Sequence, residues 1–385
     1  MGNKKRVVCV VITARPSYSR IKTVLTAINN HDLLDLKLVV AGPALLSKYG
    51  NVSKYIERDG FKIDYKVSTM LEGESLLTSA KSVGLGIVEL SAVFSEIKPD
   101  VVVTVADRFE TMSTAIASSF QNITLAHIQG GEVTGSIDEK VRHSITKLSD
   151  IHLVSSQDAF DRVYKLGESK ETIFNTGCPS IDIAKEVFEN SDLDFNPFEK
   201  YGGVGKVFDY GKYLVVLQHP VTTEHDKSFF QAEQTLQAIN ELNIPTFWFW
   251  PNIDAGSDGT SNAIRSFREN NSLDKIHFFK NMVPHDFLKL LVNSVCIVGN
   301  SSVAIRECSY LAVPAVNIGT RQEGRIRGSN VIDVNYDKDK IFDAVNTQMS
   351  SNFESDTVFG RGDSGNKIAD ILANSELKFD KKIRY

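Results

Sequence analysis

Short apolar runs alternate with segments of helical periodicity along most of the chain, and this alternation is the feature that most constrains the fold. Strands that alternate with helices form βαβ units, so the sequence predicts a mostly parallel sheet with helices on its faces. In the first half, strand candidates lie at 7–12, 36–41, 101–105, 123–128, 151–154 and 173–175, and helical patterns at 21–29, 76–97, 111–120, 138–148 and 159–166.

The same alternation restarts after a segment rich in proline, glycine, asparagine and aspartate. A chain of 385 residues is too long for one core, so two domains are expected. We predict an N-terminal domain at 1–177, a linker with one short helix at 178–212, and a C-terminal domain at 213–364. The second set of strand candidates is 213–217, 246–250, 276–279, 295–298 and 315–317, with helical patterns at 228–242, 263–270, 284–293, 303–311, 340–349 and 366–374.

Composition excludes several classes of function. A net charge of -5 gives no reason to expect a surface for nucleic acid. The four cysteines lack the spacing of a zinc site or a disulfide framework, which fits a reducing cytosol. No Gly-x-Gly-x-x-Gly follows the first strand, so we expect no dinucleotide cofactor. No apolar run approaches the roughly 20 residues of a membrane span, so we expect a cytoplasmic protein without membrane contact.

Polar residues follow the first strands at the edge of the sheet where ligands bind in parallel sheets. Arg15, directly after the first strand candidate, either binds a diphosphate or is a solvated loop arginine. Asp107 and Arg108 follow the strand candidate at 101–105. Asp107 is either a catalytic base or ligand anchor, or the N-cap of the next helix.

The segment after the strand candidate at 123–128 carries the densest set of polar groups. Gly130 and Gly131 let the backbone pass close to a ligand, and Glu132 and Asp138 supply carboxylates for proton transfer. Asp138 and Arg142 are spaced to pair on one helix face. His127, which ends the strand, is interpreted as structural.

The second domain offers a site for an anion. His219 follows its first strand, where it either reaches a ligand or is satisfied within its loop. Ser301 and Ser302 end a buried strand and open the helix predicted at 303–311, whose first N–H groups favour a phosphate. Glu307, inside that helix, fits hydrogen bonds from ribose hydroxyls, and Arg321 follows the next strand.

These groups predict a diphosphate site that needs no metal, in the cleft between the two domains. The two Asp-x-Asp matches, at 192–194 and 337–339, follow no strand that lines such a cleft, so we interpret both as solvated carboxylates. Arginines must then offset the charge of the diphosphate.

The sequence resembles the hydrolysing UDP-N-acetylglucosamine 2-epimerases of sialic acid biosynthesis and their relatives that act on 2,4-diacetamido sugars. The resemblance covers nearly the whole chain and rests on long ordered stretches. These are HIQGGEVTGSIDEKVRHSITKLS, LQHPVTT, PNIDAGS, GNSSVAIRE and GTRQEGR.

The resemblance implies a GT-B-like fold of two Rossmann-like domains, with the final helix within 365–385 packing back on the first domain. It implies anti elimination of the nucleoside diphosphate from the sugar nucleotide to leave a glycal, followed by hydration to the free 2-epimer. It implies a homo-oligomer, dimer or tetramer, with a nucleotide-sugar substrate. We assign catalytic roles to Asp107, Glu132, Asp138 and His219, and substrate binding to Arg15, Arg108, Gln129, His219, Asn252, Ser301, Ser302, Glu307 and Arg321.

Two positions depart from the family pattern. Gln129 stands where the family often has glutamate, and a glutamine cannot act as a general base. Ser17 stands where the family often has aspartate in its first loop. We interpret both changes as adaptation to a modified hexose, such as a 2,4-diacetamido-6-deoxy sugar.

Two other classes remain open. A GT-B glycosyltransferase would use the same donor but would need an acceptor, and a catalytically dead regulator would bind the donor without turnover. Sequence does not decide between UDP and GDP.

Overall fold

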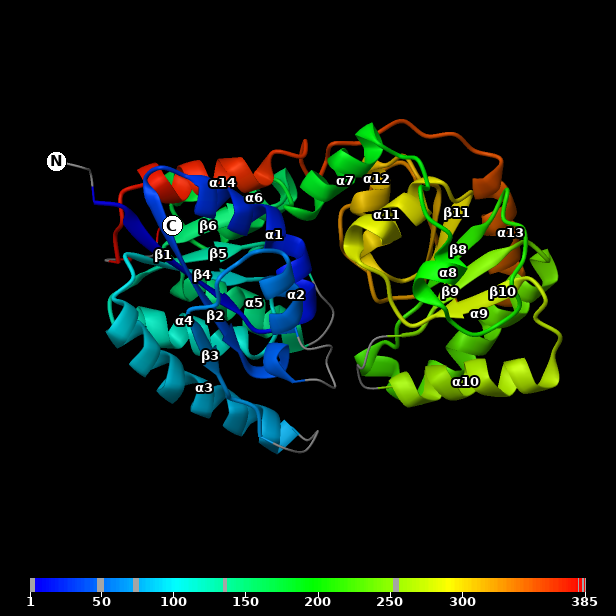
Figure 1. Cartoon of the computed structure of the whole chain (residues 1–385), viewed down its shortest axis with the longest axis horizontal. Helices are drawn as coiled ribbons and strands as arrows, with labels where there is room; N and C mark the ends of the chain where they lie inside the picture. Colours follow the sequence, from blue (N-terminus) through cyan, green and yellow to red (C-terminus); the bar gives the residue numbers. More distant parts are fainter. Residues whose placement is uncertain are drawn as a thin grey trace. The chain divides into compact units, whose positions relative to one another are not determined.

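A computed structural model describes residues 4–46, 52–71, 76–133, 137–251, 256–379, 381–382 and 384. The chain divides into two compact units (Figure 1). Among the described residues, unit 1 comprises those up to 133, 137–182 and those from 360 onward, and unit 2 comprises those within 183–359. Both termini therefore belong to unit 1, and unit 2 is inserted between two parts of it.

Unit 1 is built on a seven-stranded sheet in the order β3-β2-β1-β4-β5-β6-β7, with every pair parallel. Its strands are β1 Arg6–Ile12, β2 Leu34–Ala41, β3 Tyr65–Val67, β4 Val101–Val105, β5 Thr124–Ile128, β6 Ile151–Val154 and β7 Ile173–Asn175. Its helices are α1 Arg15–Asn30, α2 Val52–Arg58, α3 Leu76–Ile97, α4 Thr111–Ser119, α5 Ile137–Leu148, α6 Gln157–Lys165 and α14 Ser364–Asn374, while α7 Ser180–Glu189 leads into unit 2.

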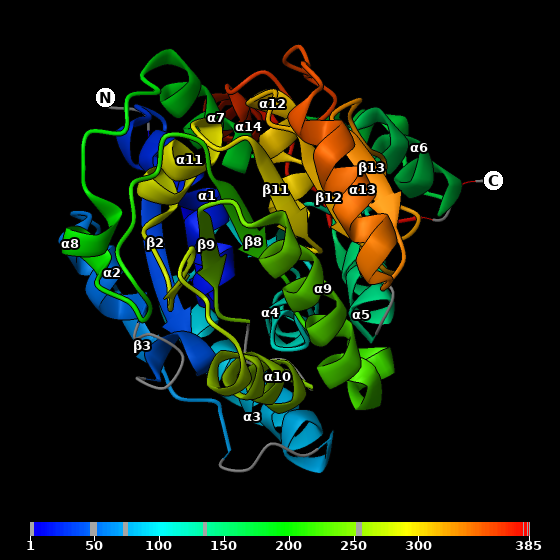
Figure 2. The same cartoon turned by 90° about the vertical axis from the view of Figure 1, so that its right-hand side faces the viewer.

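Unit 2 repeats the same topology with a six-stranded parallel sheet in the order β10-β9-β8-β11-β12-β13 (Figure 2). Its strands are β8 Leu214–Leu217, β9 Thr246–Phe249, β10 Ile276–Phe279, β11 Cys296–Gly299, β12 Ala315–Ile318 and β13 Val331–Val334. Its helices are α8 Pro197–Tyr201, α9 Ser228–Leu242, α10 Ser257–Asn270, α11 Pro284–Val292, α12 Glu307–Tyr310 and α13 Lys338–Met349. The sheet of unit 2 has the doubly wound order 3-2-1-4-5-6 in its own numbering, and the sheet of unit 1 has the same order followed by a seventh strand, so the predicted α/β class with two Rossmann-like sheets is confirmed.

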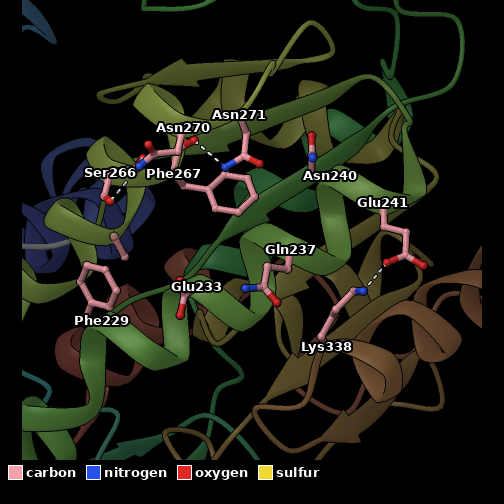
Figure 3. A pocket seen from close by; sticks show the side chains of 11 residues that line it. Phe229, Glu233, Gln237, Asn240, Glu241, Ser266, Phe267, Asn270, Asn271 and Lys338 are labelled. Carbon is pink, nitrogen blue, oxygen red and sulfur yellow. Dashed lines mark hydrogen bonds and ion pairs between the residues drawn. The ribbon is translucent and has the colours of Figure 1, made fainter.

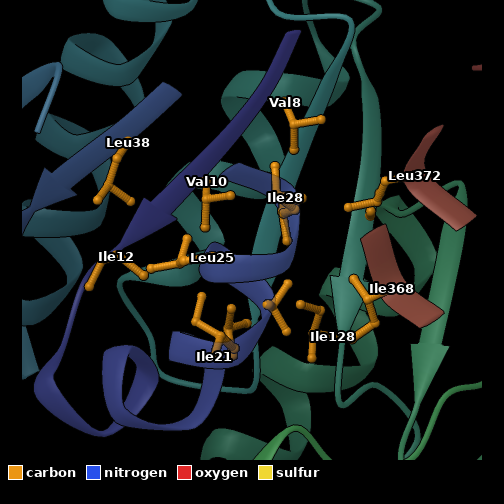
Figure 4. Packing of buried hydrophobic residues seen from close by; sticks show 14 of the residues in the cluster. Val8, Val10, Ile12, Ile21, Leu25, Ile28, Leu38, Ile128, Ile368 and Leu372 are labelled. Carbon is orange, nitrogen blue, oxygen red and sulfur yellow. The ribbon is translucent and has the colours of Figure 1, made fainter. Parts of the chain in front are cut away.

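The apolar residues whose spacing predicts these elements also form the core of unit 1. Alternate residues of β1 point to the same face of the sheet, where they meet the apolar stripe of α1 at positions 21, 25 and 28 (Figure 4). Ile368 and Leu372 of α14 close the same cluster, so the end of the chain packs on its beginning. Leu90 and Phe94 of α3 belong to the cluster on the opposite face of the sheet.

Asp182 of α7, the last residue of unit 1 before the chain enters unit 2, fixes the start of α14. Its carboxylate accepts the N–H groups of Ser364 and Gly365 at 2.9 and 2.8 Å and the hydroxyl of Thr23 at 2.8 Å. Burial raises the pKa of Asp182, although these hydrogen bonds oppose the shift. The bonds join α1 to α14 and secure the return of the chain to unit 1.

Two expectations need correction, and three short elements were missed. The segment 178–212, predicted to hold one short helix, contains both α7 and α8. Phe198 of α8 packs on Phe247 with ring centroids 5.6 Å apart, so this part of the segment belongs to the body of unit 2. The helix predicted at 303–311 is broken into a 3-10 turn, Ser302–Ala304, and the four-residue α12. The short strands β3 and β13 and the helix α2 were not predicted from the sequence.

Candidate active site

The order of strands reverses at one point in each sheet, between β1 and β4 in unit 1 and between β8 and β11 in unit 2. Crevices at the carboxyl ends of such strands are the usual ligand sites of this architecture. Arg15 and Asp107 follow the two strands of the first switch point, and His219 and Asn300 follow those of the second.

In unit 1, Asp107 is held by an arginine from a different element. Ala106 leaves β4 in a left-handed conformation, with a φ of 63°, and its N–H donates to the carbonyl of Ile128 at 2.9 Å. This turn directs Asp107 toward α5, where the carboxylate forms an ion pair with Arg142. Arg142 is 1% exposed, and its guanidinium also donates to the carbonyl oxygen of Gln129 at 2.5 Å.

The sequence spacing predicted that Arg142 pairs with Asp138 one turn earlier. Arg142 instead joins the ends of β4 and β5 through Asp107 and Gln129, a contact that sequence spacing cannot reveal. Asp138 lies in the first turn of α5, where its carboxylate is favoured by the helix dipole. Glu132, before that helix, is 7% exposed.

Both polar atoms of the Gln129 side-chain amide form hydrogen bonds. Its φ is 64°, an uncommon value for a residue with a side chain, and the residue is fully buried. Arg20 of α1 donates to the amide oxygen at 3.2 Å, and the amide nitrogen donates to the Sγ atom of Cys178 at 3.0 Å. The side chain therefore presents a set orientation, with its carbonyl oxygen engaged by a cation. Neither Arg20 nor Cys178 was among the predicted site residues.

His127 has the structural role that was predicted from the sequence. It is fully buried on β5, its Nε2 atom lies 2.8 Å from the carbonyl oxygen of Ala106, and burial lowers its pKa to about 3. A Cβ atom on Gly130 would lie 2.9 Å from its Nδ1 atom. The glycine at this position is therefore required for packing against the imidazole.

The two predicted arginines of unit 1 lie against side chains that the sequence did not single out. Arg15 begins α1, and its guanidinium carbon lies 5.2 Å from the ring centroid of Tyr55 on α2. Arg58 approaches the same ring at 5.3 Å, so Tyr55 positions two cations through cation–π contacts. Arg108 forms two hydrogen bonds with the buried carboxylate of Glu110, at 3.2 and 3.0 Å.

In unit 2, Asn300 ties the ends of β8 and β11 together. Its side-chain oxygen accepts the backbone N–H of His219 at 2.7 Å, and its amide nitrogen donates to the backbone carbonyl of His219 at 2.8 Å. Asn300 is fully buried. Gly299 precedes it with a φ of 140°, and a Cβ atom there would lie 2.2 Å from the carbonyl oxygen of Leu217. Asn300 is the residue of this site that sequence reasoning passed over, although it stands inside the quoted motif.

Arg321 reaches the same turn from the end of β12. Its guanidinium donates to the carbonyl oxygen of Asn300 at 3.2 Å, and the amide of Gln322 donates to the same oxygen at 2.8 Å. His219 is 6% exposed, and burial together with the charge of Arg321 lowers its pKa well below its usual range. At neutral pH the imidazole is therefore neutral, and Arg321 supplies a fixed positive charge at this switch point.

The helix expected to carry the phosphate site after β11 is shorter than predicted. Ser301 caps only the short 3-10 turn, where its hydroxyl oxygen accepts the N–H of Val303 at 3.4 Å. Ser302 is the first residue of that turn, and the backbone breaks again at Arg306 before α12. Glu307 is the first residue of α12 rather than a residue inside a long helix. The dipole at this turn is therefore that of a short 3-10 turn rather than of a long helix, and the cationic side chain of Arg321 adds positive charge beside it.

Asn252 lies outside the described residues. A cavity of about 440 Å³ lies elsewhere in unit 2 (Figure 3), lined by residues of α9, α10 and Lys338, and it includes none of the predicted site residues. Lys338 forms an ion pair with Glu241 across its edge. Over the part of the chain that the structure describes, no group of three or more histidine, cysteine, aspartate or glutamate residues could hold a metal ion.

Two doubly wound sheets with polar residues at both switch points define the chain as a member of the large class of Rossmann-type proteins. Similarity to known proteins identifies the family within that class. Residues 26–373 match the family described as UDP-N-acetylglucosamine 2-epimerase, and the chain belongs to this family.

Two bacterial relatives match nearly the whole chain. It is 32% identical to a UDP-N-acetylglucosamine 2-epimerase of Neisseria meningitidis over 97% of this chain and 96% of the relative. It is 30% identical to the hydrolysing UDP-N,N'-diacetylbacillosamine 2-epimerase of Legionella pneumophila over 97% of each chain. A crystal structure of UDP-GlcNAc 2-epimerase from Neisseria meningitidis bound to UDP-GlcNAc superimposes with a TM-score of 0.77 at 16% identity, covering 96% of this chain and 100% of that one. This last likeness concerns the fold.

Proposed function

We propose that the chain is a hydrolysing sugar-nucleotide 2-epimerase. A base removes the proton from C2 of the sugar while the bond between C1 and the diphosphate oxygen breaks, which leaves a glycal and the nucleoside diphosphate. Water then adds across the C1–C2 double bond, with its oxygen on C1 and a proton on C2 from the opposite face. The net reaction consumes one water and yields the free 2-epimer.

The observation that carries this proposal is the cationic switch point of unit 2. The C2 proton is not adjacent to a carbonyl, so its loss is not assisted by enolate formation and the diphosphate must leave with its charge held in place. Arg321 lies 3.2 Å from the carbonyl of Asn300, and Asn300 in turn fixes the backbone of His219 through two hydrogen bonds. This arrangement holds one cation and one neutral imidazole in fixed positions, which is the preorganisation that stabilises a departing anion.

His219 assists in a protonation state set by its surroundings. Its pKa is lowered by burial and by Arg321, so the imidazole enters the reaction neutral and offers a ring N–H as a hydrogen-bond donor. Negative charge that develops on the diphosphate favours the protonated imidazole and so raises its pKa during departure. Ser301 and Ser302 add hydroxyl donors, and Glu307 accepts hydrogen bonds from ribose. Asn252 is assigned to nucleotide contact through the motif alone.

Unit 1 supplies the groups for the sugar. Asp107 removes the C2 proton, and Arg142 fixes its carboxylate from the buried side. Glu132 and Asp138 are the remaining carboxylates for proton transfer in the hydration step. Arg15 and Arg108 contact the substrate, and Gln129 takes no part in proton transfer because its amide carries no titratable proton.

The preferred substrate is a 2,4-diacetamido-6-deoxy hexose carried on UDP or GDP. Support comes from the Legionella pneumophila relative and from a Campylobacter jejuni relative described as a GDP/UDP-N,N'-diacetylbacillosamine 2-epimerase. Gln129 and the buried Ser17 also replace two carboxylates of the common pattern with neutral groups. Neutral hydrogen-bonding groups suit an additional acetamido group better than carboxylates do, because an acetamide presents both a donor and an acceptor.

The experiment is product analysis by mass spectrometry in deuterated water, with a panel of UDP- and GDP-linked amino sugars and no acceptor. The proposal requires free 2-epimer with one deuterium at C2, together with the nucleoside diphosphate. Simple hydrolysis leaves C2 unlabelled, and a glycosyltransferase releases no 2-epimer without an acceptor, so either result would refute the proposal. Faster turnover of plain UDP-N-acetylglucosamine than of the diacetamido donors would overturn only the sugar assignment.

Asp107→Asn tests the base. Turnover is expected to fall by at least about a thousandfold, because general base catalysis and the fixed geometry are both lost, while the donor still binds. Asp35→Asn is the matched control, because this aspartate also pairs with a cation, Lys37, at 3.0 Å but lies at the start of β2, on the amino edge of the sheet. Undiminished turnover by Asp107→Asn would remove Asp107 from the mechanism.

A further inference from the structure

The cavity of unit 2 lies between two neighbouring helices. The helices α9 and α10 connect consecutive parallel strands, so they run side by side in the same direction. Near their start they pack closely, because a Cβ atom on Gly259 of α10 would lie 2.1 Å from the hydroxyl oxygen of Ser228 on α9. Beyond this contact the space between the helices widens into the cavity of about 440 Å³ (Figure 3). That volume lies within the range of sites for small molecules.

One wall of the cavity is a row of polar side chains on α9. Glu233, Gln237 and Asn240 line it at intervals of four and three residues, which places them on one helix face over about 10 Å. Leu236 and Ile239 of the same helix turn instead toward the sheet, where they are buried in the core of unit 2. Over the part of the chain that the structure describes, none of the three polar side chains forms a hydrogen bond or an ion pair. Their carboxylate and amides are therefore available to a ligand.

The other wall, on α10, is apolar along its length. Ala263 and Phe267 line it one helical turn apart. The asparagines at its end are satisfied by their own helix, because Asn270 donates to the carbonyl of Ser266 at 2.8 Å and Asn271 donates to the carbonyl of Phe267 at 2.9 Å. A row of open hydrogen-bonding groups on α9 is thus opposed by an apolar surface on α10.

The charges around the cavity decide which ligands fit. Among the described residues that line it, Lys338 alone is cationic, and its ammonium is paired with the carboxylate of Glu241. The carboxylate of Glu233 is left over, so the cavity carries one net negative charge. Phosphate and carboxylate groups would be repelled by it. The cavity therefore does not suit a nucleotide, a nucleotide sugar or an acidic sugar.

A neutral sugar matches both walls. Its hydroxyl groups donate to a carboxylate such as that of Glu233, and the apolar C–H face of its ring packs on an aromatic side chain such as Phe267. Phe229, which is 39% exposed, adds a second ring near the start of α9. The amides of Gln237 and Asn240 each present a donor and an acceptor, and an acetamido group presents the same pair.

We propose that the cavity between α9 and α10 binds a neutral N-acetylated monosaccharide. Glu233 accepts hydrogen bonds from the sugar hydroxyls, Gln237 and Asn240 hold the acetamido group, and Phe267 covers the apolar face of the ring. The free 2-epimer is a sugar of this kind, so the identity of the ligand as the enzyme's own product rests on the proposed function. The site itself is separate, because its lining includes none of the residues assigned to catalysis or substrate binding.

The experiment is saturation-transfer difference NMR of the full chain, titrated with N-acetylmannosamine at millimolar concentrations. Saturable binding is expected. Mannose, which lacks the acetamido group, should bind about fivefold more weakly or worse, because the hydrogen bonds to the two amides are lost. The titration involves no turnover, so a failure to bind the sugar and a failure to epimerise a sugar nucleotide are separate results.

Substitutions in the polar wall locate the bound sugar. Glu233→Gln should weaken binding about tenfold, since a hydrogen bond to a charged group is lost, and Gln237→Leu about threefold. The double variant should show no saturable binding. Both new residues are good helix formers, so the melting temperature should match that of the wild type. Glu269→Gln is the matched control, because Glu269 is an exposed carboxylate of α10 that does not line the cavity.

Three results would overturn the proposal. They are a wild type without saturable binding, equal affinities for N-acetylmannosamine and mannose, and a double variant that keeps the wild-type dissociation constant. The last result would mean that the sugar binds elsewhere, for example at the switch points. Binding of spermidine without binding of the sugar, abolished by Glu233→Gln, would assign the cavity to a polyamine and would overturn the proposal as well.

Discussion

Asn300 offers the sharpest test of how the second switch point is held together. Asn300→Ala removes two hydrogen bonds, of 2.7 and 2.8 Å, that join its side chain to the backbone of His219 in a buried environment. Removing the partner of a buried polar group costs about 1–3 kcal/mol, so the two losses together lower the free energy of unfolding of unit 2 by about 2–6 kcal/mol. Turnover should fall as well, because His219 loses its fixed position.

Tryptophan fluorescence during urea unfolding measures this loss in unit 2 alone. The chain has two tryptophans, at positions 248 and 250, and both belong to unit 2, where Trp248 is fully buried. With a denaturant slope of about 2 kcal/mol per molar urea, in the middle of the usual range, the midpoint should fall by roughly 1–3 M. Asn270→Ala is the matched control, since Asn270 is exposed and its side chain donates to the carbonyl of Ser266 in its own helix at 2.8 Å. A midpoint for Asn300→Ala no lower than that of the control would refute the reasoning.

Two further predictions concern packing and pH. Gly299→Ala should destabilise unit 2 by about 2–4 kcal/mol in the same fluorescence assay, because the added Cβ atom meets the carbonyl of Leu217 and the φ is left-handed. Gly211→Ala, in open space, should not; equal effects would contradict this account. Burial raises the pKa of Glu168, but hydrogen bonds from His152, Lys147 and Lys381 outweigh it and lower that pKa to about 2. The stability that this carboxylate contributes is present above its unfolded pKa, near 4.5, and is lost as pH falls toward 2. The calorimetric melting temperature of the wild type should therefore fall steeply over this pH range, and that of Glu168→Gln should fall more gently. Parallel curves for the two proteins would argue against the assignment.

Much of the fold could be predicted because the buried side of each helix or strand requires apolar residues at regular intervals in the sequence. The strands β4, β6, β7 and β10 and the helices α3 and α9 have the bounds that the apolar patterns predict. The strand β13 was missed because none of its residues is fully buried and its pattern is weak. The three-residue β3 is too short to show a period.

The break between Ser302 and Glu307 shows a different limit. The apolar positions from 303 to 311 fit a helix, but this local pattern carries no information about hydrogen-bond donors from distant parts of the chain. The side chain of Asn330 donates to the carbonyl of Ala304 at 3.3 Å and to that of Val313 at 2.8 Å. A carbonyl engaged from outside is less available to a regular helix, so the backbone bends there. The contact between Asn330 and Ala304 joins residues 26 positions apart, so a sequence pattern taken over about eleven residues cannot reveal it.

The candidate site was predictable in its positions and less so in its contacts. Strand ends identify where Arg15 and Asp107 stand in unit 1 and where His219 and Arg321 stand in unit 2, because parallel topology brings the carboxyl ends of the strands to one edge within each sheet. Which side chain each one meets depends on turns such as the left-handed Ala106, which directs Asp107 to Arg142. These partners come from segments far apart in the chain, and periodicity carries no information about them.

The return of α14 to unit 1, secured by Asp182, has a consequence for synthesis on the ribosome. The core residues Ile368 and Leu372 are translated last, yet they cover side chains of α1 that are translated first. Unit 2, which is continuous in sequence from about residue 183 to 359, can complete its sheet while unit 1 still waits for its final helix. A nascent chain arrested shortly before residue 364 would therefore leave uncovered the part of this cluster that Ile368 and Leu372 close, and the unit that is begun first would be finished after unit 2.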